Sequence, residues 1–258
     1  MLNTLRFGRP GAAPPLIIAH GLFGSARNWG AIARALADRG EVIAVDMRNH
    51  GESLHHPDHS YPALAGDLAE VVAAAATDSG GPVDLLGHSM GGKAAMMLAL
   101  THPEGLRRLV VADIAPIAYG HSQQGLIAAM RGLDLAGLDS RAEADRRLAE
   151  HIDDPGLRGF LLQSLELRAK PPRWRLNLDA LEANMDGIIG WPAPEGRFEG
   201  PALFLAGGSS DYVRPEHRKP IREAFPRARI ARIPEAGHWL HADRPEATAA
   251  TLRSFLDA

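Results

Sequence analysis

The chain contains no cysteine among its 258 residues. Disulfide bonds, thiolate metal sites and cysteine nucleophiles are therefore excluded. The chain also lacks any apolar run long enough to cross a bilayer, and residues 1–15 hold no apolar core of a signal peptide. We therefore expect a cytoplasmic protein without a membrane span.

Positive charge is carried almost entirely by arginine, because lysine occurs only at Lys93, Lys170 and Lys219. The net charge of −3 gives no reason to expect a nucleic acid or an anionic membrane as a partner. Hydrophobic residues (45%) and charged residues (23%) are as frequent as in ordinary globular proteins. The length suits one α/β domain with an insertion, and it is sufficient to bury a large core.

Residues 83–97, with the sequence VDLLGHSMGGKAAMM, form the stretch around which the chain is organised. The apolar run at 83–86 predicts a buried strand, and the good helix formers at 94–100 predict a helix. Between them GHSMG fits the nucleophile elbow G-x-S-x-G, in which glycines let the strand and helix backbones approach closely. Such a turn exposes the hydroxyl of Ser89 at the carboxyl edge of the sheet. It also places the N–H of Met90 at a helix N-terminus, where an oxyanion can bind.

A second glycine-rich loop, with the sequence HGLFG from His20 to Gly24, follows a short apolar run at 16–19. Glycine lets the chain turn so that backbone N–H groups face a pocket. We expect this loop to provide the other half of an oxyanion hole, with Leu22 as the favoured donor and Phe23 next to it. Taken alone, the motif fits a tight strand-to-helix loop without a chemical role equally well.

Strands and helices alternate along the chain, and this order predicts a mostly parallel sheet flanked by helices. Apolar runs predict strands over residues 2–7, 16–19, 41–46, 83–86, 108–112, 202–206 and 228–233. Helical spacing and end signals predict helices over residues 29–39, 61–76, 94–100, 215–225 and 245–256. The predicted fold class is therefore α/β.

Residues 117–199 differ from the rest, because they are rich in arginine, mostly helical in pattern and without a clear strand. We interpret them as a helical cap inserted between two parts of the core at 1–116 and 200–258. The apolar residues of the insertion predict an apolar pocket for an acyl group, although they also suit a small core of its own. These residues are Leu126, Ile127, Met130, Phe160, Leu161, Leu165, Trp174, Ile188 and Trp191.

The arginines of the insertion are compatible with an anionic substrate, but a solvated helix face explains them more simply. They are Arg131, Arg141, Arg146, Arg147, Arg158, Arg168, Arg173 and Arg175.

His238 follows a glycine at the carboxyl end of the last predicted strand, where a general base would be positioned. Two acids compete to orient it: Asp113 after the strand at 108–112, and Asp211 after the strand at 202–206. Both would lie at the carboxyl edge of the sheet, so their positions in the sequence do not separate them. A further loop histidine, His50, is interpreted as structural.

The order of serine, acid and histidine along the chain differs from the orders in chymotrypsin and subtilisin. A serine hydroxyl is a poor nucleophile at neutral pH, so Ser89 needs a base within hydrogen-bond reach. His238 would take the serine proton and later give it to the leaving group. The acid would hold the imidazole in the correct tautomer. This chemistry requires no metal ion and no cofactor.

Eight motifs extend over nearly the whole chain: HGLFGSARNW, DMRNHGES, GHSMGGKAAM, LVVADIAP, FLLQSL, GWPAP, LFLAGGSSDYV and AGHWLHADRP. Together they resemble the YbfF-type esterases, a branch of the α/β-hydrolase superfamily with a helical cap. The resemblance implies an α/β-hydrolase fold and hydrolysis of carboxylic esters with short to medium acyl chains. Acyl-CoA thioesters are a further candidate substrate. The resemblance also implies Asp113 of the DIAP motif as the acid, while this chain departs from the family pattern by having Asp211.

The same fold also carries other reactions. Epoxide hydrolases and haloalkane dehalogenases use an aspartate at the elbow, so Ser89 argues against both. A C–C bond hydrolase or a cofactor-free haloperoxidase uses the same three residue types and stays open. A non-catalytic ligand-binding member would be expected to lack at least one of them, which makes this alternative the weaker one.

Overall fold

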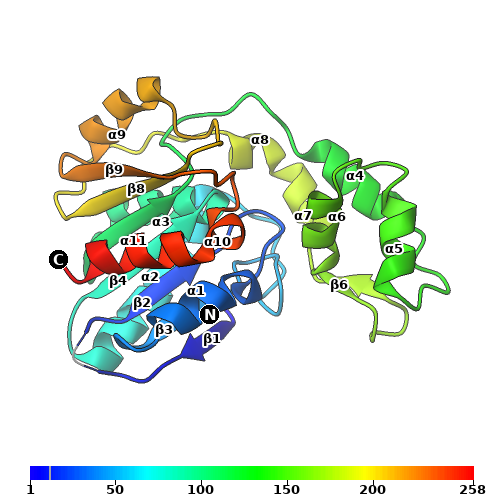
Figure 1. Ribbon diagram of the computed structural model, residues 1–258, viewed down its shortest axis with the longest axis horizontal. Helices are drawn as coiled ribbons and strands as arrows, with labels where there is room; N and C mark the ends of the chain where they lie inside the picture. Colours follow the sequence, from blue (N-terminus) through cyan, green and yellow to red (C-terminus); the bar gives the residue numbers. More distant parts are fainter. Residues whose placement is uncertain (12) are drawn as a thin grey trace.

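A computed structural model describes residues 1–11 and 13–258 of the chain. A seven-stranded sheet with the order β1-β3-β2-β4-β5-β8-β9 forms the centre of the molecule (Figure 1). β1 pairs antiparallel with β3, and the other neighbours in this sheet are parallel. Its strands are β1 Thr4–Phe7, β2 Leu16–Ala19, β3 Val42–Val45, β4 Val83–His88, β5 Leu106–Ala112, β8 Ala202–Gly207 and β9 Ala228–Ile233. The predicted class is confirmed.

Helices cover both faces of this sheet (Figure 1). On one face α1 (Gly30–Leu36) packs beside α11 (Pro245–Leu256), and on the other α2 (Tyr61–Ser79) packs beside α3 (Met90–Thr101). Because successive strand residues point to opposite faces, the buried β2 residues divide between the two cores, with Ile17 in one and Ile18 in the other. Burial of both faces explains why the central strands are apolar throughout instead of alternating.

Local signals in the sequence set the ends of α2. The hydroxyl of Ser60 accepts a hydrogen bond from the N–H of Ala63 at the start of the helix. Gly80 ends the helix in the left-handed conformation, with φ of 70°. The helix therefore runs three residues past the predicted end at residue 76, as far as the last residue before this glycine.

Two other predicted helices are too long: the helix predicted over 29–39 ends at Leu36, and the one predicted over 215–225 begins with a 3-10 turn. Residues 26–29 and 215–217 form 3-10 turns, which precede α1 and α9 (Arg218–Ala224). A short helix, α10 (Leu240–Asp243), lies just before α11. Within the described ranges 1–11 and 13–258, no helix is both long enough and apolar enough to span a membrane.

The insertion, residues 117–199, lies between β5 and β8 in the sequence and extends to one side of the sheet (Figure 1). Its elements are α4 Gln124–Gly132, α5 Arg141–Leu148, α6 Pro155–Leu162, β6 Leu165–Glu166, β7 Arg173–Trp174, α7 Leu178–Ala183 and α8 Met185–Ile189. The expectation that it holds no strand is wrong, because β6 and β7 pair antiparallel. The domain boundaries at 116 and 200 stay a prediction.

Candidate active site

Ser89 occupies a strained turn between β4 and α3, with φ of 52° and ψ of −119°. A Cβ atom on Gly87 would lie 2.2 Å from the carbonyl oxygen of Gly91, and one on Gly91 would lie 2.4 Å from that of His20. Glycine is therefore required at both positions, as the elbow motif predicts. Strain at a residue other than glycine is typical of functional sites, since the surrounding structure must hold the residue in place.

His238, in the loop after β9, joins the serine to an acid. Its Nε2 atom is 3.0 Å from Ser89 Oγ, and its Nδ1 atom is 2.8 Å from Asp113 Oδ2. The ring of Tyr212 stacks on the imidazole with the centroids 4.0 Å apart. The carbonyl oxygen of His238 accepts a hydrogen bond from His88 Nε2 at 2.9 Å. Both the ring and the backbone of His238 are thus held in one orientation.

Asp113 is fully buried directly after β5. Its Oδ1 atom accepts the N–H of Gly207 at 2.9 Å, and its Oδ2 atom accepts the hydroxyl of Ser210 at 2.5 Å. A buried carboxylate needs such donors to remain ionised. An ionised Asp113 in turn makes Nδ1 of His238 the protonated nitrogen, which leaves Nε2 free to accept the Ser89 proton.

The alternative acid, Asp211, is not the partner of His238. Its side chain is 88% exposed, and its carboxylate lies 3.7 Å from the guanidinium of Arg214. The residue before it, Ser210, contacts Asp113 instead. Sequence reasoning missed Ser210, although the GGSSDYV motif that drew attention to Asp211 also contains it.

Two of the three expected oxyanion donors have N–H groups without an acceptor in the described parts of the chain. Met90 is the first residue of α3, so its N–H has no partner within the helix. The N–H of Leu22 has none among the described residues. Phe23 is a correction, because its N–H donates to Nε2 of His50 at 3.1 Å and is not available to a ligand.

A cavity of about 290 Å³ adjoins Ser89 and His238. The core lines it with both glycine-rich loops, and the insertion adds Leu126, Leu157, Phe160 and Ile188. Of the other apolar residues expected there, Leu161, Leu165, Ile127 and Met130 are buried within the hydrophobic core cluster. Some of these apolar residues therefore line the pocket and others form a core, so each expectation fits a different set of residues.

The arginines of the insertion mostly form ion pairs with its own acids. Arg131 pairs with Asp179 and Glu182, while Arg158 pairs with Asp145. Arg146 and Arg147 share Glu143, and Arg173 and Arg175 share Glu166. This pattern favours the interpretation as a solvated surface over that as an anion site.

Lys93, in the first turn of α3, is a buried cation at the wall of the cavity. Its Nζ donates to the carbonyl oxygens of Ile189 at 2.8 Å and Gly190 at 2.6 Å, at the end of α8. Burial lowers the pKa of Lys93 to about 7. The residue therefore connects the core helix that begins at Ser89 to the last helix of the insertion.

Similarity to known proteins shows the family to which the chain belongs. Residues 16–251 match the model of the alpha/beta hydrolase family, and the chain belongs to that family. A marine microorganism esterase has a structure with a TM-score of 0.91 to this one, at 38% identity and 98% coverage of both chains.

Relatives that match nearly the whole chain show to which branch of the family it belongs. The esterase YbfF of Escherichia coli is 37% identical over 94% of this chain and 93% of its own. The mouse protein named sn-1-specific diacylglycerol lipase ABHD11 is 41% identical over 94% of this chain and 81% of its own. The chain is therefore a carboxylic ester hydrolase of the alpha/beta hydrolase family, in the YbfF-type branch.

Proposed function

We propose that the protein hydrolyses carboxylic esters through an acyl-enzyme intermediate, with Ser89 as nucleophile, His238 as general base and Asp113 as the acid that orients it. The observation that carries the proposal is the continuous chain of short contacts from Ser89 Oγ through the His238 ring to Asp113. These are the distances that proton transfer to and from a reacting group requires.

Acylation begins when Ser89 Oγ attacks the ester carbonyl and its proton moves to His238 Nε2. The carbonyl oxygen becomes an oxyanion, which the N–H groups of Leu22 and Met90 would stabilise. Collapse of this intermediate breaks the bond to the alcohol oxygen. His238 gives its proton to that oxygen, so the alcohol leaves neutral and the acyl group stays on Ser89.

Deacylation repeats the sequence with water as the nucleophile. His238 takes one proton from the water while the oxygen attacks the acyl carbon, and the same two N–H groups stabilise the second oxyanion. The bond to Ser89 then breaks, and His238 returns the proton to Oγ. The carboxylic acid is released and the enzyme returns to its initial state.

Asp113 would act without taking a proton itself. Its bond to Nδ1 favours the tautomer with a free Nε2 and stabilises the imidazolium that forms in each step. Ser210 and the N–H of Gly207 would hold the carboxylate in place.

The cavity supports an apolar acyl group of short to medium length as the substrate, with the insertion acting as a cap that bounds it. Most of its insertion wall is apolar, formed by Leu126, Leu157, Phe160, Ile188 and Ile189, while Tyr119, His121 and Gln123 add polar atoms. Among the described residues of the insertion, no arginine, lysine or carboxylate lines the cavity. Because most of the cap arginines are paired with acids, they give acyl-CoA thioesters little specific support. We therefore place simple esters before thioesters.

The test is hydrolysis of nitrophenyl esters of increasing acyl length by the wild type and by Ser89→Ala. We expect turnover that falls by about 10⁴-fold or more in the variant, with the fold unchanged in circular dichroism. Activity of Ser89→Ala within tenfold of the wild type would contradict the role of Ser89. If the wild type turned over no ester or thioester, the non-catalytic ligand-binding alternative would take precedence.

A further inference from the structure

His50, in the loop after β3, is a fully buried histidine that the reaction itself does not use. Its Nδ1 atom lies 2.9 Å from the carbonyl oxygen of Arg48. A carbonyl oxygen only accepts, so Nδ1 carries the proton and Nε2 of the neutral ring is an acceptor. Burial and the neighbouring histidines hold the pKa of His50 well below its usual value, which agrees with a neutral ring.

The loop that contains the proposed oxyanion donor, Leu22, uses Nε2 of His50 as a hydrogen-bond acceptor. The N–H of Phe23 donates to Nε2 of His50 at 3.1 Å. Phe23 has φ of 63°, and the N–H of Gly24 bonds to the carbonyl oxygen of Gly21 at 3.0 Å, so residues 21–24 form a tight turn. A positive φ at the third position of such a turn normally favours glycine. Phe23 therefore needs an external contact to stay there.

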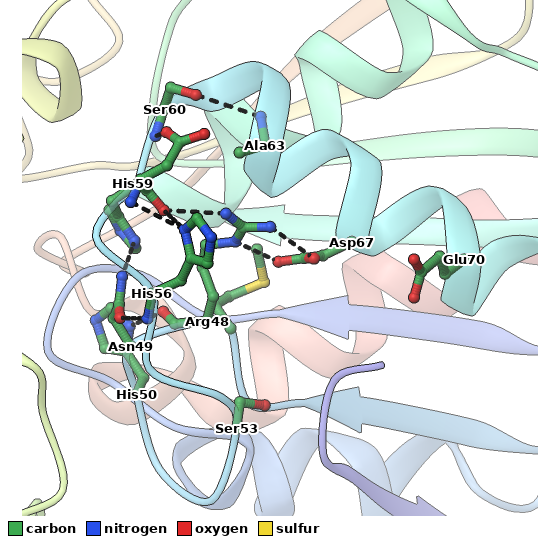
Figure 2. A network of polar contacts seen from close by, with 12 residues as sticks. Arg48, Asn49, His50, Ser53, His56, His59, Ser60, Ala63, Asp67 and Glu70 are labelled. Atoms are coloured by element: carbon green, nitrogen blue, oxygen red, sulfur yellow. Dashed lines mark hydrogen bonds and ion pairs between the residues drawn. The ribbon is translucent and has the colours of Figure 1, made fainter. Parts of the chain in front are cut away.

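His50 is well suited to provide this contact because its own backbone is fixed. Figure 2 shows Arg48 facing both oxygens of Asp67, with contacts of 2.6 Å and 2.8 Å. The N–H of His50 bonds to the carbonyl oxygen of Met47, and its backbone forms a bridge with Leu176 of the insertion. The backbone of His50 is thus held from the core and from the insertion, and its ring is held by Arg48.

We propose that His50 is a positioning residue of the oxyanion hole. By accepting the N–H of Phe23, it keeps the turn in the strained conformation in which the neighbouring Leu22 N–H has no internal acceptor and lines the cavity beside Ser89. Without this acceptor, the Phe23 N–H would be buried and unpaired, and the turn would relax to satisfy it. The inference rests on the proposed ester hydrolysis.

The experiment compares His50→Asn with His50→Gln. The glutamine places an amide oxygen near the position of Nε2 and can accept the Phe23 N–H, whereas the shorter asparagine reaches only the position of Nδ1. We expect kcat to fall by about 30-fold in His50→Asn, since one oxyanion donor is typically worth about 10²- to 10³-fold and would be misplaced, not removed. KM should stay within about twofold, and His50→Gln should recover most of the lost kcat.

Two further measurements separate positioning from stability. A trifluoromethyl ketone adds to the serine as a transition-state analogue, and His50→Asn should weaken its binding by the same factor as kcat. Asp67→Asn is the matched control, because it removes the charge that pairs with Arg48 while its amide oxygen can still accept from the guanidinium and hold the loop, and the contact between His50 and Phe23 remains. It should lower the melting temperature while kcat stays within about threefold.

The result that overturns the inference is a kcat of His50→Asn within threefold of the wild type, or a loss that appears in KM alone. If His50→Asn does not fold, nitrogen NMR of the wild-type histidine rings decides: a proton on Nε2 of His50 contradicts the inference, and one on Nδ1 supports it. Failure of the proposed function looks different, because then the wild type itself hydrolyses no ester.

Discussion

The cavity beside Ser89 has two walls that are built in different ways. The core wall presents polar groups held by short hydrogen bonds, as in the contacts from Ser89 through His238 to Asp113. The insertion wall presents mainly apolar side chains, and most charges of that segment pair with one another at its surface. Chemistry needs atoms fixed to fractions of an ångström, whereas selection of an apolar acyl chain needs only shape and volume.

This comparison predicts that substitutions in the core wall change the rate for all substrates. Substitutions in the insertion wall should change the preference among substrates. After the loss of activity in Ser89→Ala, we expect the largest difference in kcat between variants of Asp113 and Asp211, the two acids that the sequence did not separate.

Asp113→Asn should lower kcat by about 10⁴-fold, as in the serine-protease example of a lost orienting carboxylate. The amide donates where the carboxylate accepted, so His238 would be held in the wrong tautomer. Asp211→Asn is the matched control, and its exposed position predicts a kcat within about twofold of the wild type. Nitrophenyl ester kinetics measure both, and a larger loss in Asp211→Asn would reverse the assignment of the acid.

Ser210→Ala should have a smaller effect of the same kind. Loss of its hydroxyl removes one of the two other donors to Asp113, while the N–H of Gly207 remains. We expect kcat to fall by about tenfold, which corresponds to about 1.4 kcal/mol, with KM little changed. A kcat equal to that of the wild type would show that Gly207 alone is sufficient.

The sequence predicts the elbow and the base well because their signals are local. Gly87 is required by the backbone of Gly91 four residues further on, and the G-x-S-x-G pattern is complete within five residues even though the atom that Gly91 must avoid belongs to His20. His238 lies in the loop directly after the last strand. The positions of the two acids in the sequence did not separate them, and only the resemblance implied Asp113. The choice depends on β5 lying beside β8, which brings Gly207 and Ser210 to Asp113.

Two other features could not be predicted for a similar reason. The pair β6 and β7 has two residues per strand, too few for any periodic pattern. Which N–H of the HGLFG loop is available depends on His50, which is 27 positions from Phe23 along the chain. Contacts between distant segments decide each of these points.

Phe160→Ala tests the insertion wall. The ring of Phe160 from α6 packs against that of Trp239, with centroids 5.2 Å apart, and both rings line the cavity. Removing it widens the cavity, so the ratio of kcat/KM for a long acyl ester to that for acetate should rise by about three- to tenfold. Activity on acetate should stay within about twofold. Equal losses for all chain lengths would mean that the insertion also positions the chemistry.

Lys93 lies where the two walls meet, and its substitution should change the rate little. Lys93→Met keeps the apolar part of the side chain but removes the amino group and its bonds to Ile189 and Gly190. We expect kcat within about threefold of the wild type and a pH-dependent change in stability. In the folded protein the pKa is lowered from 10.5 to about 7, so between these values the unfolded chain binds the extra proton. The free energy of unfolding of the wild type should therefore rise with pH in this window, by at most about 1.4 kcal/mol per pH unit.

The comparison between wild type and Lys93→Met isolates this contribution, because the other titrating groups are common to both. Urea unfolding at pH 6, 8 and 10 should show the wild type gaining stability relative to the variant as pH rises. A constant difference over this range would mean that the bonds to the two carbonyl oxygens keep Lys93 charged in spite of its burial. Lys93 would then connect core and insertion as an ammonium group bonded to two carbonyl oxygens, and its charge would not change with pH near neutrality.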